Sequence, residues 1–333
     1  MNILIVRLGA LGDIIHAVPA AAALRNAFPD ARIDWLVEAR HRPMVDLVSV
    51  IDRAVVLERP SMTAWLDVSR RLRQVRYDAA IDFQGLMKSA ILARASGAPR
   101  VIGFSIWHLR EKGARPFYSE THRDTPAERA DHIVRQNLAL LRSLGVNDTT
   151  IRFPLADVRS RALEEIQTAL GGERPFALIN PGAAWPNKRW PPDRFGEIAA
   201  FLREVRGLPS FILWGPGEEG LAGAVVETSS GAARIAPPTR LADLLALSRA
   251  SSLMVSGDTG PLHIAAAVGT PTVSLFGPTD PQRNGPWNPD DVTVSRYGVC
   301  GCHYERRCRK AEWCLESLSV PEVTAAVQQR FQR

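Results

Sequence analysis

A polar turn between an apolar run and an alanine-rich segment is the feature that most restricts the fold of this chain. Residues 253–255 are apolar, Asp258 and Thr259 lie in the turn, and alanines that suit a helix follow Pro261. This order predicts a buried strand, a tight loop and then a helix. Pro261 fits the first helical turn, where its missing N–H needs no partner. The unpaired N–H groups at the start of the helix predict an anion-binding site.

Two further features favour ligand binding over a purely structural role for this turn. Asp258 or Thr259 alone is typical of a residue that caps a helix. However, His263 follows on the first turns of the same helix, and a second polar loop, residues 277–281, follows the apolar run 272–275. Open α/β sheets bind ligands at the loops after the carboxyl ends of neighbouring parallel strands. We therefore expect both loops at one binding site.

The first half of the chain alternates apolar and amphipathic segments, which is typical of a parallel sheet with helices on both faces. Pro19 is expected to bend or break the helix predicted at residues 14–27. A long helix is predicted at 127–144, ending at Gly145. Strands are predicted at residues 2–7, 33–37, 54–57, 79–83 and 101–104, and further helices at 62–75 and 86–95.

The α/β pattern restarts after a polar segment near residue 150, and 333 residues are enough for two domains. We expect a first domain at 1–150 and a second at 151–318. A final helix within 319–333, announced by a Ser-Val-Pro-Glu start signal, is expected to cross back onto the first domain. Strands of the second domain are predicted at residues 177–180, 211–214, 253–256, 272–276 and 292–295.

Composition and charge narrow the class of protein. Hydrophobic residues make up 46% and charged residues 23% of the chain, as in soluble globular proteins. No apolar run approaches the roughly 18 residues of a membrane-spanning helix. The apolar N-terminus lacks a basic region before it, and Arg7 and Asp13 interrupt it. We therefore expect a core strand of a cytoplasmic protein. A net charge of +6 does not by itself indicate nucleic-acid binding.

A cluster of arginines lies between residues 59 and 76, where Asp67 is the single acidic residue. Such a run is equally typical of a solvated helix face and of a surface for an anionic substrate or a membrane. Both interpretations stay open at this point. The arginines are Arg59, Arg70, Arg71, Arg73 and Arg76.

The loop at residues 9–13 joins the first predicted strand to the first predicted helix, which is where a dinucleotide would bind. It lacks the G-x-G-x-x-G pattern, and Asp13 would repel a pyrophosphate, so we do not expect an NAD site. The positive end of the helix keeps an acid at this position ionised. Asp13 could therefore accept a proton from a substrate hydroxyl, and the alternative role is a simple helix cap.

Three other loops carry candidate ligands. Lys88 follows a strand in the first half, as an anion ligand or as a surface residue. Lys188 lies in an unusual loop with Trp185 and Trp190, which are expected to pack, and is well placed to meet a phosphate. Glu218 ends a strand beside a second carboxylate, and such acids bind the two hydroxyls of a ribose in nucleotide sites.

All four cysteines lie in one short basic segment, with the spacing C-x-C-x5-C-x5-C. Structural zinc sites prefer paired C-x2–4-C arms, so the spacing fits zinc only loosely, although His303 could add a ligand. Disulfides are the second interpretation and buried free thiols are the favoured one, because we expect a reducing compartment. We expect the segment to lie apart from the binding loops. The cysteines are Cys300, Cys302, Cys308 and Cys314.

Taken together, these motifs resemble those of the lipopolysaccharide heptosyltransferases, over nearly the whole chain. They are specific in combination and weak singly. The segment 82–90 looks like the heptosyltransferase I branch, whereas the cysteine segment is more like what other branches carry. The remaining matching motifs are residues 3–7, 12–19, 257–263 and 277–281.

The resemblance implies a GT-B fold, in which two Rossmann-like, doubly wound parallel-sheet domains face a central cleft. It implies ADP-L-glycero-β-D-manno-heptose as the donor in the second domain, the Kdo residue of Kdo2-lipid A as the acceptor in the first, and inversion without a metal or other cofactor. Asp13 is the implied general base. We assign donor contacts to Lys188, Glu218, Asp258, Thr259, Gly260, Leu262 and His263, and acceptor contacts to Gly12, Arg59, Lys88 and Arg110, with Lys112 and Arg115 nearby.

An anionic lipid acceptor implies a cytoplasmic enzyme that contacts the inner face of the inner membrane transiently, and no nucleic-acid partner. Transfer to a heptosylated core is the nearest alternative. A GT-B nucleotide-sugar epimerase and a non-catalytic binder are less favoured. The presence of Asp13, Lys188 and His263 together argues against the binder.

Overall fold

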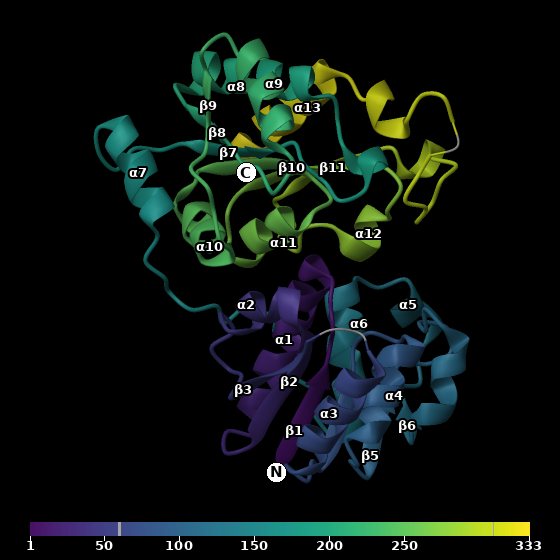
Figure 1. Ribbon diagram of the computed structural model, residues 1–333. Coiled ribbons are helices and arrows are strands. Elements are labelled where there is room, and N and C mark those ends of the chain that lie inside the picture. Colours follow the sequence, from purple (N-terminus) through teal and green to yellow (C-terminus); the bar gives the residue numbers. More distant parts are fainter. Residues whose placement is uncertain (59–60, 309) are drawn as a thin grey trace. The chain divides into compact units, whose positions relative to one another are not determined.

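The computed structural model describes residues 1–58, 61–308 and 310–333, and these form two compact units, Met1–Ala156 and Asp157–Arg333 (Figure 1). The division falls a few residues after the predicted boundary near residue 150. The boundary lies later because Leu155 forms a β-bridge with Val48 of unit 1. In addition, the Ala156 N–H donates to the Leu47 carbonyl at 2.8 Å, which ties the end of the segment to unit 1.

Unit 1 is built on a six-stranded sheet in the order β3-β2-β1-β4-β5-β6, with every neighbouring pair parallel. This order is that of a doubly wound Rossmann-like sheet. The five predicted strands are confirmed, and the sixth was missed because it spans only two residues. The strands are β1 Asn2–Val6, β2 Arg32–Glu38, β3 Arg53–Leu57, β4 Ala79–Asp82, β5 Arg100–Gly103 and β6 Glu120–Thr121.

Helices cover both faces of this sheet, with α3 and α4 in contact on one face and α1 and α6 in contact with each other (Figure 1). Helix α1 starts at Leu11, so Asp13 lies in its first turn, and Pro19 lies inside it without ending it. The helices are α1 Leu11–Ala27, α2 Arg42–Val45, α3 Met62–Arg73, α4 Met87–Ala95, α5 Pro126–Arg129 and α6 Ile133–Leu140, with 3-10 turns η1 Ala39–His41, η2 Lys112–Phe117 and η3 Leu141–Leu144.

The single helix predicted at 127–144 is wrong, because the chain breaks between α5 and α6. His132 starts the second helix, and its ring Nδ1 accepts the Val134 N–H at 3.2 Å. Such local capping competes with helix continuation. The predicted end is confirmed, since Gly145 is left-handed with φ 79°.

Unit 2 repeats the plan, with six parallel strands in the order β12-β11-β10-β7-β8-β9. The five predicted strands are confirmed, and the missed strand β9 is short and partly exposed. The strands are β7 Ala177–Asn180, β8 Ser210–Ile212, β9 Ala233–Ile235, β10 Leu253–Gly257, β11 Thr272–Phe276 and β12 Val292–Ser295. The helices are α7 Arg161–Leu170, α8 Pro192–Arg206, α9 Glu219–Thr228, α10 Leu241–Ala250, α11 Gly260–Ala267, α12 Pro281–Asn284 and α13 Val320–Gln332, with 3-10 turns η4 Pro186–Lys188, η5 Tyr297–Val299 and η6 Cys314–Ser317.

The C-terminal helix α13 packs on β11, β12 and α8 within unit 2. Val323 and Val327 are fully buried in the core of this unit. Its expected crossing onto the first domain stays a prediction. Among the described helices of the whole chain, none has the length and apolar character that a membrane span needs.

Candidate active site

Four loops of unit 2 gather at the carboxyl edge of its sheet, because its strands are parallel. They follow β7, β8, β10 and β11, which are consecutive neighbours in the sheet in the order β11-β10-β7-β8. The loops after β10 and β11 are the two that the sequence predicts at one site, and the structure confirms that they meet. Lys188 comes from the loop after β7 and Glu218 from the loop after β8.

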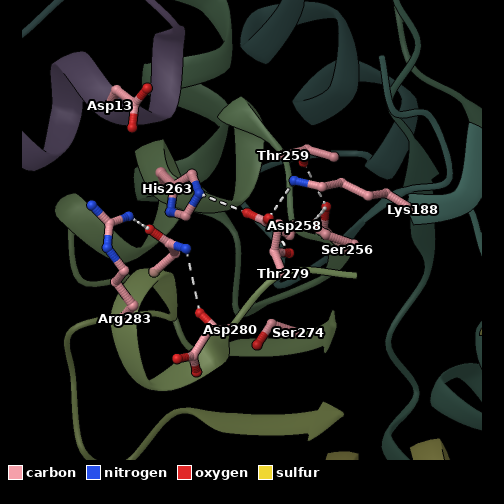
Figure 2. A network of polar contacts seen from close by, with 12 residues as sticks. Asp13, Lys188, Ser256, Asp258, Thr259, His263, Ser274, Thr279, Asp280 and Arg283 are labelled. Carbon is pink, nitrogen blue, oxygen red and sulfur yellow. Dashed lines mark hydrogen bonds and ion pairs between the residues drawn. The ribbon is translucent and has the colours of Figure 1, made fainter. Parts of the chain in front are cut away.

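Asp258 is the centre of a polar network that joins three of these loops (Figure 2). Its Oδ2 lies 2.5 Å from Lys188 Nζ and accepts the Thr279 hydroxyl at 2.6 Å. Its Oδ1 lies 3.1 Å from His263 Nε2. Asp258 therefore fixes a lysine and a histidine from separate segments at the start of α11, which an isolated helix cap would not do.

The charges in this network determine the protonation state of Asp258. Burial opposes its ionisation, but the hydrogen bond from His263 and the charge of Lys188 outweigh burial and hold the pKa of Asp258 well below its usual range. The Lys188 side chain is only 14% exposed, and its ammonium also lies 4.5 Å from the centre of the Trp185 ring. The expected packing thus holds for Trp190, which is buried against Phe195, whereas Trp185 faces Lys188.

The start of α11 presents backbone donors next to this network. Thr259 is the helix N-cap, but its hydroxyl is held by Asn180 Nδ2 at 3.0 Å and by Ser256 Oγ at 3.0 Å, so it caps no N–H of the helix. The N–H groups of Gly260 and Leu262 belong to the first turn, which has no partners within the helix. Gly260 is partly exposed, whereas Leu262 is fully buried, so its expected donor contact stays a prediction.

Two glycines allow the loops at this edge of the sheet to pack closely against one another. A Cβ on Gly257 would lie 2.8 Å from the Lys188 carbonyl, so glycine lets the Lys188 loop approach β10. Likewise, a Cβ on Gly182 would lie 2.2 Å from Glu218 Oε2. The Glu218 carboxylate accepts the Gly215 N–H at 3.0 Å and lies 3.7 Å from Arg189. Glu218 is therefore held in the loop after β8, and its role as a ribose ligand stays a prediction.

In unit 1 the predicted base, Asp13, lies at the carboxyl edge of the other sheet. It forms an ion pair with Arg7 at 2.5 Å and lies 3.3 Å from Arg110 through both carboxylate oxygens. Two guanidinium groups stabilise the ionised carboxylate. The Asp13 side chain is 17% exposed and that of Arg110 is 44% exposed, so both can meet a ligand.

Arg7 was not predicted as a site residue, although it directly follows the first apolar strand. Its side chain is 4% exposed, and it donates to the Phe83 carbonyl as well as to Asp13. Burial lowers the pKa of Arg7, and the charge of Asp13 opposes this effect. Arg7 thus holds the Asp13 carboxylate in position from the buried side. An arginine directly after an apolar strand, six residues before an acid, is the signal that could have identified it.

The other predicted acceptor ligands are spread over unit 1. Gly12 lies beside Asp13 in the first turn of α1. Lys88 lies at the same sheet edge, paired with Glu38 at 2.8 Å, so it is not a free cation. Arg59 lies outside the described residues.

Two members of the arginine cluster, Arg73 and Arg76, lie away from Asp13. Arg73 donates to the carbonyl of Ala95, at the end of α4, and the Arg76 carbonyl accepts from Asn2, at the start of β1. These arginines therefore lie toward the amino edge of the sheet, opposite Asp13. The physical reason is helix length, because α3 runs from one sheet edge to the other.

The cysteine segment contacts the site loops, which corrects the expectation that it lies apart from them. The Asn187 side chain donates to the Glu305 carbonyl at 2.9 Å, and the Tyr304 N–H donates to the Pro278 carbonyl at 2.9 Å. Cys300, Cys308 and Cys314 are free thiols, and the Cys302 and Cys308 Sγ atoms lie 3.0 Å apart. Burial raises the pKa of the Cys314 thiol to about 12. Within the described ranges, no group of three or more His, Cys, Asp or Glu side chains could hold a metal.

The sequence did not predict Asn180 and Thr279 as members of the site in unit 2, where they hold other side chains by hydrogen bonds. Asn180 ends β7 and donates to Ser256, Thr259 and the Gly182 carbonyl, while Thr279 donates to Asp258. Both belong to segments that were singled out for their loops. A polar residue at the end of a buried strand is the signal that points to Asn180, whereas Thr279 lies three residues after the end of β11.

Replacing Asp258 by asparagine is expected to lower the free energy of unfolding by about 3 kcal/mol at neutral pH, because it leaves the buried Lys188 ammonium without its anion. The lowered pKa means that the unfolded state takes up a proton below about pH 4 while the folded state does not, so wild-type stability falls there. The deficit of the variant should therefore shrink below about pH 4. Urea unfolding at several pH values, with the exposed Asp290→Asn as control, measures it. A pH-independent deficit would contradict this electrostatic role.

Comparison with known proteins agrees with this geometry. Residues 65–314 match the sequence profile of glycosyltransferase family 9 (heptosyltransferase). The chain is 29% identical to lipopolysaccharide heptosyltransferase 1 of Pseudomonas aeruginosa, covering 92% of this chain and 87% of that protein. It is 28% identical to lipopolysaccharide heptosyltransferase 3 of Escherichia coli K12, covering 83% and 82%.

Among solved structures, the chain superimposes on E. coli heptosyltransferase WaaC with ADP with a TM-score of 0.76 and 24% identity, covering 100% of this chain and 98% of that chain. This likeness confirms the expected fold of two Rossmann-like units. The family match spans three quarters of the sequence and includes the Lys188 and Asp258 loops. The chain therefore belongs to glycosyltransferase family 9, the heptosyltransferases, and it is an enzyme with the GT-B fold.

Proposed function

We propose that this enzyme transfers L-glycero-D-manno-heptose from ADP-heptose to a Kdo residue of Kdo2-lipid A, in the inner core of lipopolysaccharide. The observation that carries the donor assignment is the buried Asp258 network, in which Lys188 and His263 meet at the start of α11. A cation beside free helix N–H groups is suited to a diphosphate. The family match and the lipopolysaccharide heptosyltransferase relatives support the sugar and the pathway.

The donor side would act on the leaving group. As the bond between the heptose C1 and the phosphate oxygen breaks, negative charge grows on ADP, and Lys188 with the N–H group of Gly260 would stabilise it. Asp258 would position Lys188 and His263 rather than contact the phosphates, because its own charge repels them. Glu218, in the loop after β8, would bind the ribose hydroxyls.

The acceptor side would supply the nucleophile. Asp13 would take the proton from a Kdo hydroxyl as that oxygen forms the new bond to C1, from the side opposite to ADP, so the anomeric centre inverts. Arg110, with its exposed guanidinium, would bind an acceptor carboxylate or phosphate. Such an acceptor requires an enzyme in the cytoplasm that contacts the inner face of the inner membrane.

We further propose that no metal takes part in the transfer, because Lys188 and the α11 N-terminus supply positive charge where the leaving group would lie. Turnover should accordingly be unchanged by EDTA and by added Mg²⁺. Loss of turnover with EDTA that Mg²⁺ restores would overturn this proposal.

Transfer to an already heptosylated core is the second candidate function. The observation that favours it is the nearly equal identity to heptosyltransferase 1 of P. aeruginosa, at 29%, and to heptosyltransferase 3 of E. coli, at 28%. The cysteine segment, which is more like that of other branches, points the same way.

The deciding experiment measures ADP release from ADP-heptose with deacylated Kdo2-lipid A, with the same acceptor carrying one heptose, and without acceptor. Release that needs the heptose-free acceptor supports the first function. Release only with the heptosylated acceptor supports the second. Release without any acceptor would contradict both and favour an epimerase-like or hydrolytic activity.

A further inference from the structure

The exposed large apolar side chains of unit 1 are concentrated at one edge. Apart from Met1, all those in the described part of this unit lie in three segments, and we call them the apolar rim. They are Met62 (76% exposed), Leu66 (54%), Met87 (37%), Ile106 (49%) and Trp107 (66%). Leaving so many large apolar side chains in water within one region is unusual for a monomer surface and indicates an interaction site.

The topology places the three segments along the carboxyl edge of the sheet. Met62 and Leu66 lie in the first half of α3, which follows β3, and Met87 starts α4, which follows β4. Ile106 and Trp107 lie in the loop after β5. Because β1, β3, β4 and β5 are parallel, these segments share the edge that carries Asp13, and α3 and α4 are in contact on one face (Figure 1).

Helix α3 shows that this exposure is built into the sequence. Its buried face carries Val68 and Leu72, as an amphipathic helix should. Met62 and Leu66 are four residues apart and share the opposite face, where Arg70 continues the same row. An apolar pair followed by an arginine on a solvent face is typical of a helix that lies on a lipid surface.

The loop after β5 has the same mixed character. The Trp107 ring lies under the Arg129 guanidinium, 4.2 Å from the ring centre, and Ile106 is its exposed neighbour. Tryptophan beside basic side chains is enriched where proteins meet the headgroup region of a membrane. Lys112 and Arg115 follow in η2, and both are exposed.

Charge is divided unequally between the two units. Residues 1–156 contain 22 basic and 16 acidic residues, whereas residues 157–333 contain 19 of each. The whole formal charge of +6 therefore belongs to unit 1. Anionic lipid surfaces attract such a unit, at about 1 kcal/mol for each basic residue near the surface.

We propose that the apolar rim docks unit 1 on a lipid bilayer with anionic headgroups, with Ile106, Trp107, Met62 and Leu66 entering the headgroup region. The basic side chains of η2 and Arg129 then meet the lipid phosphates. This inference rests on the proposed function, because a lipid-linked acceptor must bring its sugar to Asp13 at the same sheet edge. Docking holds that edge against the membrane, so the acceptor sugar can reach the base while its lipid stays in the bilayer.

The test compares binding of the full chain to phosphatidylcholine vesicles with and without phosphatidylglycerol, in the absence of any acceptor. Wild type should bind the anionic vesicles and release from them at high salt. The double variant Ile106→Ser/Trp107→Ser should bind them about tenfold or more weakly. The control is Val205→Ser/Ile235→Ser, which removes two apolar side chains of unit 2 that are 50% and 47% exposed and should bind like wild type.

Leu66→Ser on α3 should also weaken binding to the anionic vesicles. It is an independent test, because this substitution does not alter the loop at residues 106–107. Equal binding of the rim variants and the control would overturn the proposal, as would equally tight binding of wild type to vesicles without phosphatidylglycerol. Turnover on the water-soluble, deacylated acceptor should be unchanged in the rim variants, which also shows that they fold. Failure of wild type to use that acceptor contradicts the proposed function and leaves the vesicle result standing.

Discussion

Replacing Asp13 by asparagine is expected to lower kcat for heptose transfer by roughly 10²- to 10⁴-fold, because an amide cannot take the proton of the acceptor hydroxyl. Asparagine keeps the size and the hydrogen-bonding shape of the side chain, so the acceptor can still bind. The measurement is acceptor-dependent ADP release at saturating concentrations of both substrates.

Asp13 also pairs with the buried Arg7, so the variant needs a control for folding. Binding of ADP, which we place in unit 2, should be the same in Asp13→Asn as in wild type. Asp30→Asn, at an exposed acid in the turn between α1 and β2, should change neither activity nor binding. Wild-type turnover in a folded Asp13→Asn would show that Asp13 is only a helix-start residue held by two arginines, and that the base lies elsewhere.

Replacing Lys188 by methionine is expected to reduce kcat/KM by roughly 10²- to 10³-fold, the loss that follows removal of one preorganised donor from a developing anion. Methionine retains much of the apolar stem and removes the charge that lies 2.5 Å from Asp258. Because the charge on ADP grows as the bond to heptose breaks, kcat should fall together with kcat/KM. Steady-state kinetics with ADP-heptose as the varied substrate measures both.

Arg203→Met is the matched control, since it removes one exposed cation from α8 in the same unit. It should leave both constants unchanged. If Lys188→Met raises KM and leaves kcat at the wild-type value, Lys188 binds donor and transition state equally and does not assist departure of ADP. That result would remove the leaving-group step from the proposed mechanism while keeping the donor site.

The sequence was sufficient for the architecture because its pattern is periodic and local. Ten strands were predicted from apolar runs, and β6 and β9 were missed, since β6 spans only two residues and two of the three residues of β9 are exposed. The helix break at His132 was missed for a related reason: an amphipathic pattern continues across a side chain that caps a new helix.

At the site, the sequence identified the loops better than their internal contacts. Asp258, Lys188 and His263 were predicted because they follow strands at one sheet edge, where parallel topology forces loops together. The contacts of Asp258 with Thr279 and Lys188 join residues 21 and 70 positions apart, which no local pattern encodes.

The sequence by itself determined the two α/β units, the polar loops and the acid at the start of α1, because strand and helix periodicity and turn residues act over a few neighbouring positions. Only the tertiary structure decided which charges are paired and which are exposed. In that structure Arg7 is buried next to Asp13, Lys88 is paired with Glu38, and Arg73 and Arg76 lie at the opposite sheet edge. The reason is that burial and ion pairing depend on how sheet order and helix length bring distant segments together, and these are properties of the packed chain.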